Sequence, residues 1–199
     1  MRVTVTMLLG LIALAFVASW INSYREFSDS LDSYYEVKPT DNRAEIRYRL
    51  GEPAYVLNID ASSSSDTLIY ETAKDAERPL PAGATIEGFN RWVFPTSDNT
   101  VSVSFVGEQF EFVDCYTKDR ISTACPRLAG IGIEDSEEEV LKRLGKPTKA
   151  VLHGDMKTLT YDDLHISFDL EKGRVNSASL HRGTSNFLTR YLRWSRLKG

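Results

Sequence analysis

The 199-residue chain is predicted to be an α+β protein with two tandem repeats of a helix plus an antiparallel sheet (αβββ) after one N-terminal transmembrane helix. Three observations predict this fold: an internal repeat, alternation of apolar and polar residues after each predicted helix, and an uncharged apolar run at the N-terminus. The repeat is most evident where segment 41–53 recurs 94 positions later as segment 135–147, with six of thirteen residues identical. A duplicated structural unit is the expected origin of this similarity.

The N-terminal run from Val3 to Ile21 carries no charged residue and has about the length that a helix needs to cross a bilayer. We therefore expect a transmembrane anchor over 1–22 and a linker over 23–38, with a cleaved signal peptide as the alternative. Arg2 precedes the run and acidic residues follow it, which places the N-terminus in the cytoplasm. The expected location is the bacterial inner membrane, single-pass, with the bulk of the chain in the periplasm.

Each repeat is expected to open with a helix. Repeat 1 covers 39–128 and repeat 2 covers 129–183. Asp41 and Asp135 stand where an N-cap would accept a backbone N–H, and a Gly-x-Pro sequence closes each helix. Apolar residues four positions apart on each helix share a face and are expected to pack on a sheet.

The strands are predicted from short β-branched or aromatic runs that alternate with polar residues. We expect strands over 55–59, 67–71, 100–106 and 110–114 in repeat 1, and over 150–153, 157–161, 165–170 and 174–180 in repeat 2. Such alternation is typical of a sheet with one buried face. The two open faces can close on each other, or each can bind something else.

Repeat 1 carries an insertion of about 28 residues, placed at about 72–99. It is rich in proline and glycine and contains the large aromatic residues Phe89, Trp92 and Phe94. Long loops of this composition often bind partners, since aromatic side chains anchor interfaces. The alternative is that these aromatic residues fold back over the open sheet.

The tail, 184–199, is predicted to be a basic amphipathic helix, because its apolar and basic residues separate onto opposite arcs. It suits an anionic lipid surface or an acidic partner, and docking on the acidic remainder of this chain is the alternative. The candidate partner-binding residues are Phe187, Arg190, Tyr191, Arg193, Trp194 and Arg196.

The chain has two cysteines, Cys115 and Cys125. In an exported domain such a pair favours a disulfide, which would contribute about 2 to 3 kcal/mol for so short a loop. A metal site would need further ligands nearby, and none of the three histidines is close in sequence. We therefore predict a disulfide and no metal or cofactor.

No enzyme motif is present: the sequence lacks a glycine-rich phosphate loop, a Gly-x-Ser-x-Gly turn and a spaced Cys-His pair. His165 opens a strand whose inward positions are apolar, so we expect its side chain to face solvent or lie at a turn. No catalytic residue and no nucleic-acid partner is expected for this chain, whose formal charge is −4.

Segment 132–147, followed by Leu159-Thr-Tyr161 and Ile166-Ser-Phe168, resembles the helix and strand signature of the SmpA/OmlA (BamE-like) superfamily. The resemblance implies a small exported module with a helix followed by a three-stranded antiparallel sheet, of the kind that occurs in tandem in β-lactamase-inhibitory proteins. Two departures stand out: a predicted membrane span replaces the lipobox cysteine, and Glu134 sits where glycine is usual.

These observations predict a membrane-anchored periplasmic binding or assembly protein that acts as an accessory subunit of a membrane protein complex. The alternative is an inhibitor or ligand-sensing module that engages another exported protein. Neither prediction names the partner.

Overall fold

The computed structural model describes residues 2–27, 31–59, 68–117, 123–183 and 186–198 of the chain. Within its helices, the side chains of residues 2–11, 187 and 198 are outside this description. Parts of several predicted segments therefore fall outside the described residues, among them Thr67 at the start of a predicted strand and the side chain of Phe187 in the tail.

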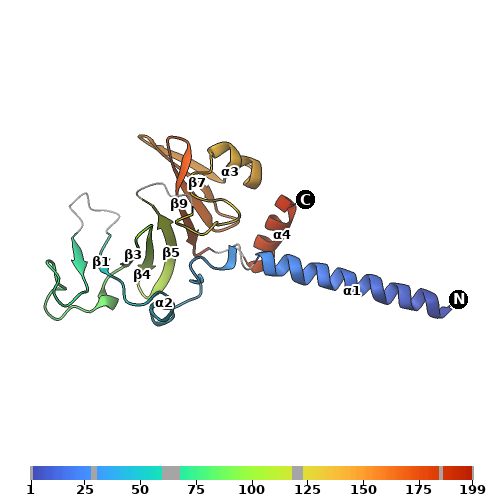
Figure 1. Ribbon diagram of the computed structural model, residues 1–199, viewed down its shortest axis with the longest axis horizontal. Helices are drawn as coiled ribbons and strands as arrows, with labels where there is room; N and C mark the ends of the chain where they lie inside the picture. Colours follow the sequence, from blue (N-terminus) through green and yellow to red (C-terminus); the bar gives the residue numbers. More distant parts are fainter. Residues whose placement is uncertain (1, 28–30, 60–67, 118–122, 184–185, 199) are drawn as a thin grey trace.

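The described strands form a single nine-stranded antiparallel sheet, in the order β2-β1-β3-β4-β5-β9-β8-β7-β6 (Figure 1). Their bounds are Tyr55–Leu57 (β1), Ile69–Glu71 (β2), Arg91–Pro95 (β3), Thr100–Val106 (β4), Gln109–Tyr116 (β5), Lys149–His153 (β6), Met156–Tyr161 (β7), Ile166–Glu171 (β8) and Arg174–His181 (β9). The helices are α1 (Arg2–Phe27), α2 (Arg43–Leu50), α3 (Glu137–Leu144) and α4 (Phe187–Lys198), with a short 3₁₀ turn, η2, at Ile86–Gly88.

The prediction of two separate αβββ repeats is wrong, because the last strand of each half pairs with that of the other. β5 lies antiparallel to β9, with Asp114 opposite Ser179 and Cys115 opposite Ala178. From this join the strand order runs outward as β5-β4-β3-β1 on one side and β9-β8-β7-β6 on the other. Edge-to-edge pairing satisfies backbone groups that two isolated sheets would leave exposed. It also merges the two open faces into one.

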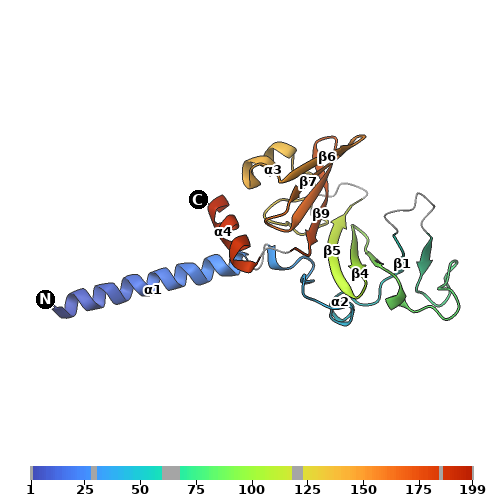
Figure 2. The same cartoon turned by 180° about the vertical axis from the view of Figure 1, so that it is seen from behind.

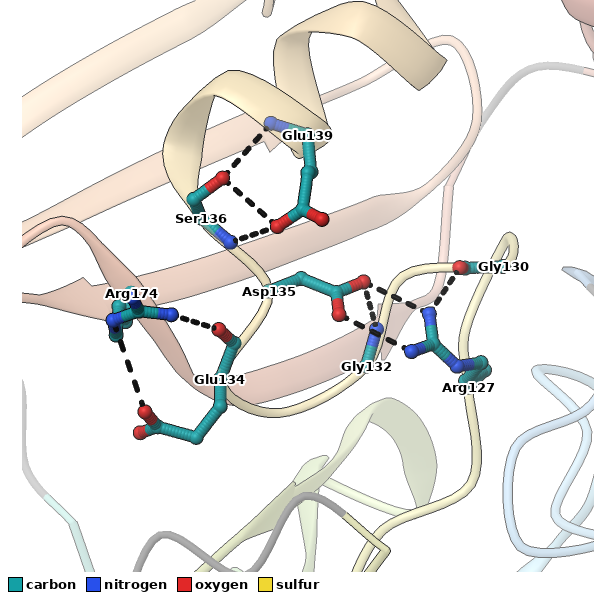
Figure 3. A network of polar contacts seen from close by, with 8 residues as sticks. All are labelled: Arg127, Gly130, Gly132, Glu134, Asp135, Ser136, Glu139 and Arg174. Atoms are coloured by element: carbon teal, nitrogen blue, oxygen red, sulfur yellow. Dashed lines mark hydrogen bonds and ion pairs between the residues drawn. The ribbon is translucent and has the colours of Figure 1, made fainter.

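The repeat is nevertheless visible in α2 and α3, which begin in the same way. Asn42 and Ser136 are the N-caps, and each forms a capping box with the glutamate three residues on, Glu45 or Glu139. The predicted caps, one residue earlier in each copy, have another role. In the second copy, Asp135 accepts the N–H of the residue three before it at 2.9 Å and pairs with a nearby arginine (Figure 3).

A tight turn precedes both helices at the same 94-residue offset. Tyr34 and Val37 exchange two backbone hydrogen bonds, and so do Leu128 and Ile131. The two central residues of each turn have positive φ, from 53° to 77°, as a type I′ turn requires. The repeated unit therefore begins within the predicted linker 23–38, earlier than residue 39.

Topology also changes which strands correspond. The strand three places from the join is β3 in the first half and β7 in the second, so β3 is the counterpart of β7. Segment 67–71, which contains β2, resembles β7 in sequence, with Thr67-Leu-Ile-Tyr70 against Thr158-Leu-Thr-Tyr161, but the strand order does not match the two. β3 lies within the predicted loop at 72–99, and β2 is the additional strand of the first half.

The helix α1 extends away from the sheet, with the N-terminus at its far end and α4 beside its C-terminal end (Figures 1 and 2). Its described apolar side chains from Ile12 to Tyr24, including Phe16 and Trp20, are exposed, whereas Phe27 at its C-terminal end is buried. No helix in the described part of the chain is both long enough and apolar enough to cross a membrane. This finding contradicts the predicted anchor through Val3 to Ile21 and the single-pass inner-membrane location. The side chains of residues 3–11 of that run are outside the described part.

One face of the sheet carries the core. Alternate residues on the central strands point to this apolar face and are buried: Val101, Val103, Phe105, Val113, Leu159, Tyr161, Ile166, Phe168, Ala178 and Leu180. The helices α2 and α3 contribute Ile46, Val140 and Leu144 to the same core. The opposite face is polar, and its central serines, Ser102, Ser167 and Ser179, are also buried.

Candidate binding surface on the polar face of the sheet

The three aromatic residues predicted to bind a partner lie in the core. Phe89, Trp92 and Phe94 are 6%, 0% and 8% exposed. The Trp92 indole donates to the carbonyl of Ile86 at 3.0 Å and its ring lies 4.9 Å from that of Phe105. Trp92 and Phe94 belong to β3, opposite Val103 and Val101, so they reach the core as part of the sheet and not as a loop folded over it.

Most of the described tail residues also make contacts within the chain. Arg190, Tyr191 and Trp194 are buried, and Arg190 donates to the carbonyl of Leu31 and lies 3.5 Å from the carboxylate of Asp32. Burial lowers the pKa of Arg190, and Asp32 opposes this effect. These contacts fix α4 against the segment that follows α1.

Two further arginines of the tail differ in exposure. Arg193 donates from Nε to Asp163 at 2.7 Å and from a terminal nitrogen to the carbonyl of Leu144 at 3.2 Å. Arg196 is exposed. Arg190 and Arg193 therefore make their described contacts with other parts of this chain. Binding of the tail to an outside partner stays a prediction.

The predicted disulfide is confirmed. Cys115 and Cys125 are bonded, with their Cα atoms 6.0 Å apart. Cys115 is on the apolar side of β5, so the bridge holds Cys125 against the core. The Tyr35 hydroxyl lies 3.2 Å from the Cys115 sulfur, which ties the turn before α2 to the same point.

The opposite face of the sheet is unusually rich in hydroxyl groups. Residues paired directly across the strands form two rows, which together with Arg91, Ser104, Phe112 and His181 we call the polar face. The first row is Val93, Ser102, Asp114, Ser179, Ser167, Thr160 and Lys149, and the second is Pro95, Thr100, Tyr116, Ser177, Asp169, Thr158 and Val151. Both rows cross the β5–β9 join without interruption.

Arg91, Ser102 and Asp114 form a closed network on the first half of this face. Arg91 donates to Asp114 at 2.8 Å and to the Ser102 hydroxyl at 3.0 Å, and Ser102 also bonds Asp114. Burial raises the pKa of Asp114, while Arg91 and Ser102 act in the opposite direction. The carboxylate of Asp114, in the centre of the sheet, is thus paired with Arg91 and hydrogen-bonded by Ser102 of the same chain.

Ser167 and His181 form a second pair, with the Ser167 hydroxyl 2.6 Å from Nε2 of His181. Burial lowers the pKa of His181, so the neutral ring predominates at neutral pH. The pair has the distance of a nucleophile and its base, but no described carboxylate hydrogen-bonds the imidazole to orient it, as a triad requires. His181 instead packs beside Phe112, with ring centroids 5.6 Å apart.

Asp169 and Ser177 face each other across β8 and β9 in the second row. The hydroxyl of Thr158 donates to Asp169 at 2.6 Å. Ser177 is 6% exposed, and its hydroxyl has no hydrogen-bond partner within the described structure. This part of the polar face is therefore less completely satisfied than the Arg91 network.

Sequence reasoning missed this surface, although a signal was present. Serine, threonine and aspartate alternate with apolar residues in β4, β5, β8 and β9, and the same alternation that predicts the core also lists the residues of the other face. His165, expected to face solvent or lie at a turn, lies at the turn before β8 but is 7% exposed.

No group of three or more metal-ligating side chains is present among the described residues. Comparison of the chain with models of protein families, with curated proteins and with solved structures found no significant match. The resemblance to the SmpA/OmlA superfamily therefore stays a prediction from the sequence.

Proposed function

We propose that this chain is a non-catalytic protein-binding module that presents the polar face of its sheet to a partner protein. The observation that carries the proposal is the continuity of the two polar rows across the β5–β9 join. A surface made from both halves of a duplicated chain is larger than either half could offer alone.

The dimensions of the polar face suit a protein partner. Seven strands, from β3 to β6, contribute to the rows, which at about 4.8 Å per strand spacing gives a width of roughly 30 Å. A specific protein interface buries about 800 Å² on each partner. A sheet face of this width can supply most of such an area, whereas a small molecule would use only a part of it.

The chemistry of the surface also favours binding. Its centre consists largely of short serine and threonine side chains, of which Ser167 and Ser179 are buried and Thr160 is partly exposed. Their hydroxyls both donate and accept hydrogen bonds. The strands fix the positions of these groups before binding, which reduces the entropy lost on association.

The proposal covers both an assembly subunit and an inhibitor, the two roles predicted from the sequence, without a membrane anchor. Support for an internal role of the aromatic and tail residues comes from their burial. On the polar face, Ser102 and Ser179 are buried, at 1% and 6% exposed, whereas Thr160 is partly exposed, so substitutions at Thr160 should affect partner binding with less effect on folding.

The experiment compares cross-linked co-purification of partners by the tagged full-length chain and two variants. Ser179→Arg and Thr160→Arg each place a long cation in the first polar row, and Tyr48→Arg places the same cation on the exposed surface of α2. We expect both row variants to lose a partner that wild type and Tyr48→Arg retain. Thermal unfolding monitors folding, and Thr160, which is partly exposed, is informative even if Ser179→Arg fails to fold.

Two results would overturn the proposal. One is a wild-type chain that retains no specific partner, and the other is a partner that remains bound to both row variants.

A further inference from the structure

We propose that Asp169, Ser177 and Tyr116 form a subsite on the polar face for one lysine or arginine side chain of the partner protein. This inference rests on the proposed function and adds the chemistry of the group that is recognised. The three residues are neighbours in the second polar row, with Ser177 between Tyr116 and Asp169.

The first observation that supports this subsite is the environment of Asp169. It is partly buried, in the middle of β8, and within the described structure it has a hydrogen bond from Thr158 but no ion pair with a cation. A carboxylate in such a place is costly unless it is paired or fully hydrogen-bonded. The pairing group that the described part of the chain does not supply can come from a partner.

Asp114 provides an internal comparison. It lies on the same face, on β5, which is on the other side of the β5–β9 join from Asp169. Its neighbours are also hydroxyl residues. There the chain supplies Arg91, whose guanidinium reaches Asp114 at 2.8 Å. The two carboxylates are close enough that Asp169 contributes to the raised pKa of Asp114. One acid of the pair is compensated internally and the other is open.

Ser177 is the second and independent reason. Its hydroxyl is buried and unpartnered among the described residues, and a buried hydroxyl without a partner has lost its bonds to water without replacement. Its position directly opposite Asp169 means that a donor placed between the two could bond both. Lysine ammonium, with three donors, and arginine guanidinium, with five, can each do this.

Tyr116 completes the subsite from the other side. Its ring stands opposite Ser177 on β5 and can contact the aliphatic stem or the charge of a basic side chain. Among the described residues, the other charged and titratable groups of the polar face are Arg91, Asp114, Lys149 and His181. Arg91 is already paired, and Lys149 stands on the edge strand β6 opposite Thr160, outside the second row.

The test uses two short peptides, acetyl-Gly-Lys-Gly-amide and acetyl-Gly-Arg-Gly-amide, with acetyl-Gly-norleucine-Gly-amide as the uncharged match. Each is titrated into the ¹⁵N-labelled full-length chain while backbone amide shifts are followed. We expect saturable shifts centred on residues 167–169 and 176–178 for the basic peptides and none for the norleucine peptide. Absence of such shifts in wild type, or equal shifts with norleucine, overturns the subsite.

Two variants locate the cation. Asp169→Asn keeps the shape of the side chain and should weaken the basic peptides by about fivefold or more, the loss of one partly exposed charge pair. Asp75→Asn, in the exposed turn after β2, removes the same charge from outside the polar face and should leave the affinity unchanged. If both variants have the same effect, the attraction is only the net acidity of the chain and the subsite is wrong.

The partner experiment separates this inference from the proposed function. Loss of partner in both Asp169→Asn and Ser179→Arg supports both. Loss in Ser179→Arg with full retention in Asp169→Asn leaves the polar face as a binding surface and overturns the basic-residue subsite. Retention in all row variants overturns both.

Discussion

The ring of Phe27, the last residue of α1, meets the indole of Trp194 in α4 edge-on, with ring centroids 5.7 Å apart and the planes at 70°. The ring of Tyr191 lies 5.6 Å from Phe27 in a similar arrangement, and the guanidinium of Arg190 stands over the same ring. Both tail aromatics are buried. Tyr191 and Trp194 thus form an internal contact between two helices that are far apart in sequence, whereas Leu188 and Leu192 of the same tail are exposed.

The first prediction concerns this contact. Arg190→Glu places a buried carboxylate beside Asp32 and the carbonyl of Leu31, where the native guanidinium donates. We expect a loss of about 3 to 5 kcal/mol, as for a buried pair that loses one partner. Urea unfolding followed by tryptophan emission measures it. Arg196→Glu, the exposed control on the same helix, should change stability by less than about 0.5 kcal/mol. Equal effects would show that Arg190 is not anchored.

The sequence predicted the helices and the positions of most strands because their signals are local. Capping residues, glycine after the helix and period-two alternation each act within a few residues. The N-caps were misplaced by one residue because Asp41 and Asn42 are both good caps, and the backbone decides which one is used. In the structure Asn42 caps α2, and Asp41 instead accepts the N–H of Lys38.

The way in which the two halves join could not be predicted from local sequence signals. Whether β5 pairs with β9 or each half closes its own sheet depends on contacts between residues more than 60 positions apart. The match of segment 67–71 to β7 was equally misleading, because a short β-branched strand resembles any other and only strand order identifies β3 as the counterpart. The alternation of polar and apolar residues along the strands indicates the polar face as well as the core, but only its apolar positions were used.

The second prediction concerns Arg43, which is 8% exposed. Its guanidinium donates to the carbonyls of Phe89 at 2.9 Å and Gly107 at 2.8 Å, and lies 4.0 Å from the ring centroid of Phe105. Arg43→Lys keeps the charge but loses the planar fork and the stacking. We expect a destabilisation of about 2 kcal/mol in chemical denaturation.

Arg47→Lys is the matched control for this substitution. Arg47 is on the same helix and pairs with Glu52 and Glu87 at the surface, where such pairs contribute about 0 to 1 kcal/mol. The expected loss is therefore smaller than for Arg43. If the two variants unfold at the same denaturant concentration, the buried contacts of Arg43 add nothing.

The third prediction concerns the disulfide. Both sulfurs are in buried residues, so the folded chain should resist a mild reductant and become reducible when denatured. Intact mass should rise by two hydrogens after reduction in denaturant. Replacing both cysteines by serine should cost about 2 to 3 kcal/mol, because the closed loop is short. Rapid thiol labelling of the native, unreduced chain would contradict the bond.

The last prediction concerns pH and His165. Burial, followed by the positive charge of Arg190 and then His181, lowers the pKa of His165 to about 4, against the opposing effect of Asp162 and Asp163. Its pKa in the unfolded chain is about 6.5. Between these values the unfolded chain binds the proton more readily, so His165 contributes stability that is fully present above about pH 6.5 and is lost as the pH falls toward 4.

His165→Asn removes this titration, and asparagine tolerates the φ of 60° found at this position. We expect the free energy of unfolding to depend less steeply on pH between 5 and 7 in this variant, by up to one bound proton, while His181 maintains a residual slope in the same direction because its pKa is also lowered by burial. Urea unfolding at a series of pH values gives both slopes. His153→Asn, on the exposed edge strand β6, should leave the wild-type slope unchanged. A His165→Asn variant that retains the full wild-type slope would show that this ring gains its proton as easily in the folded chain as in the unfolded one.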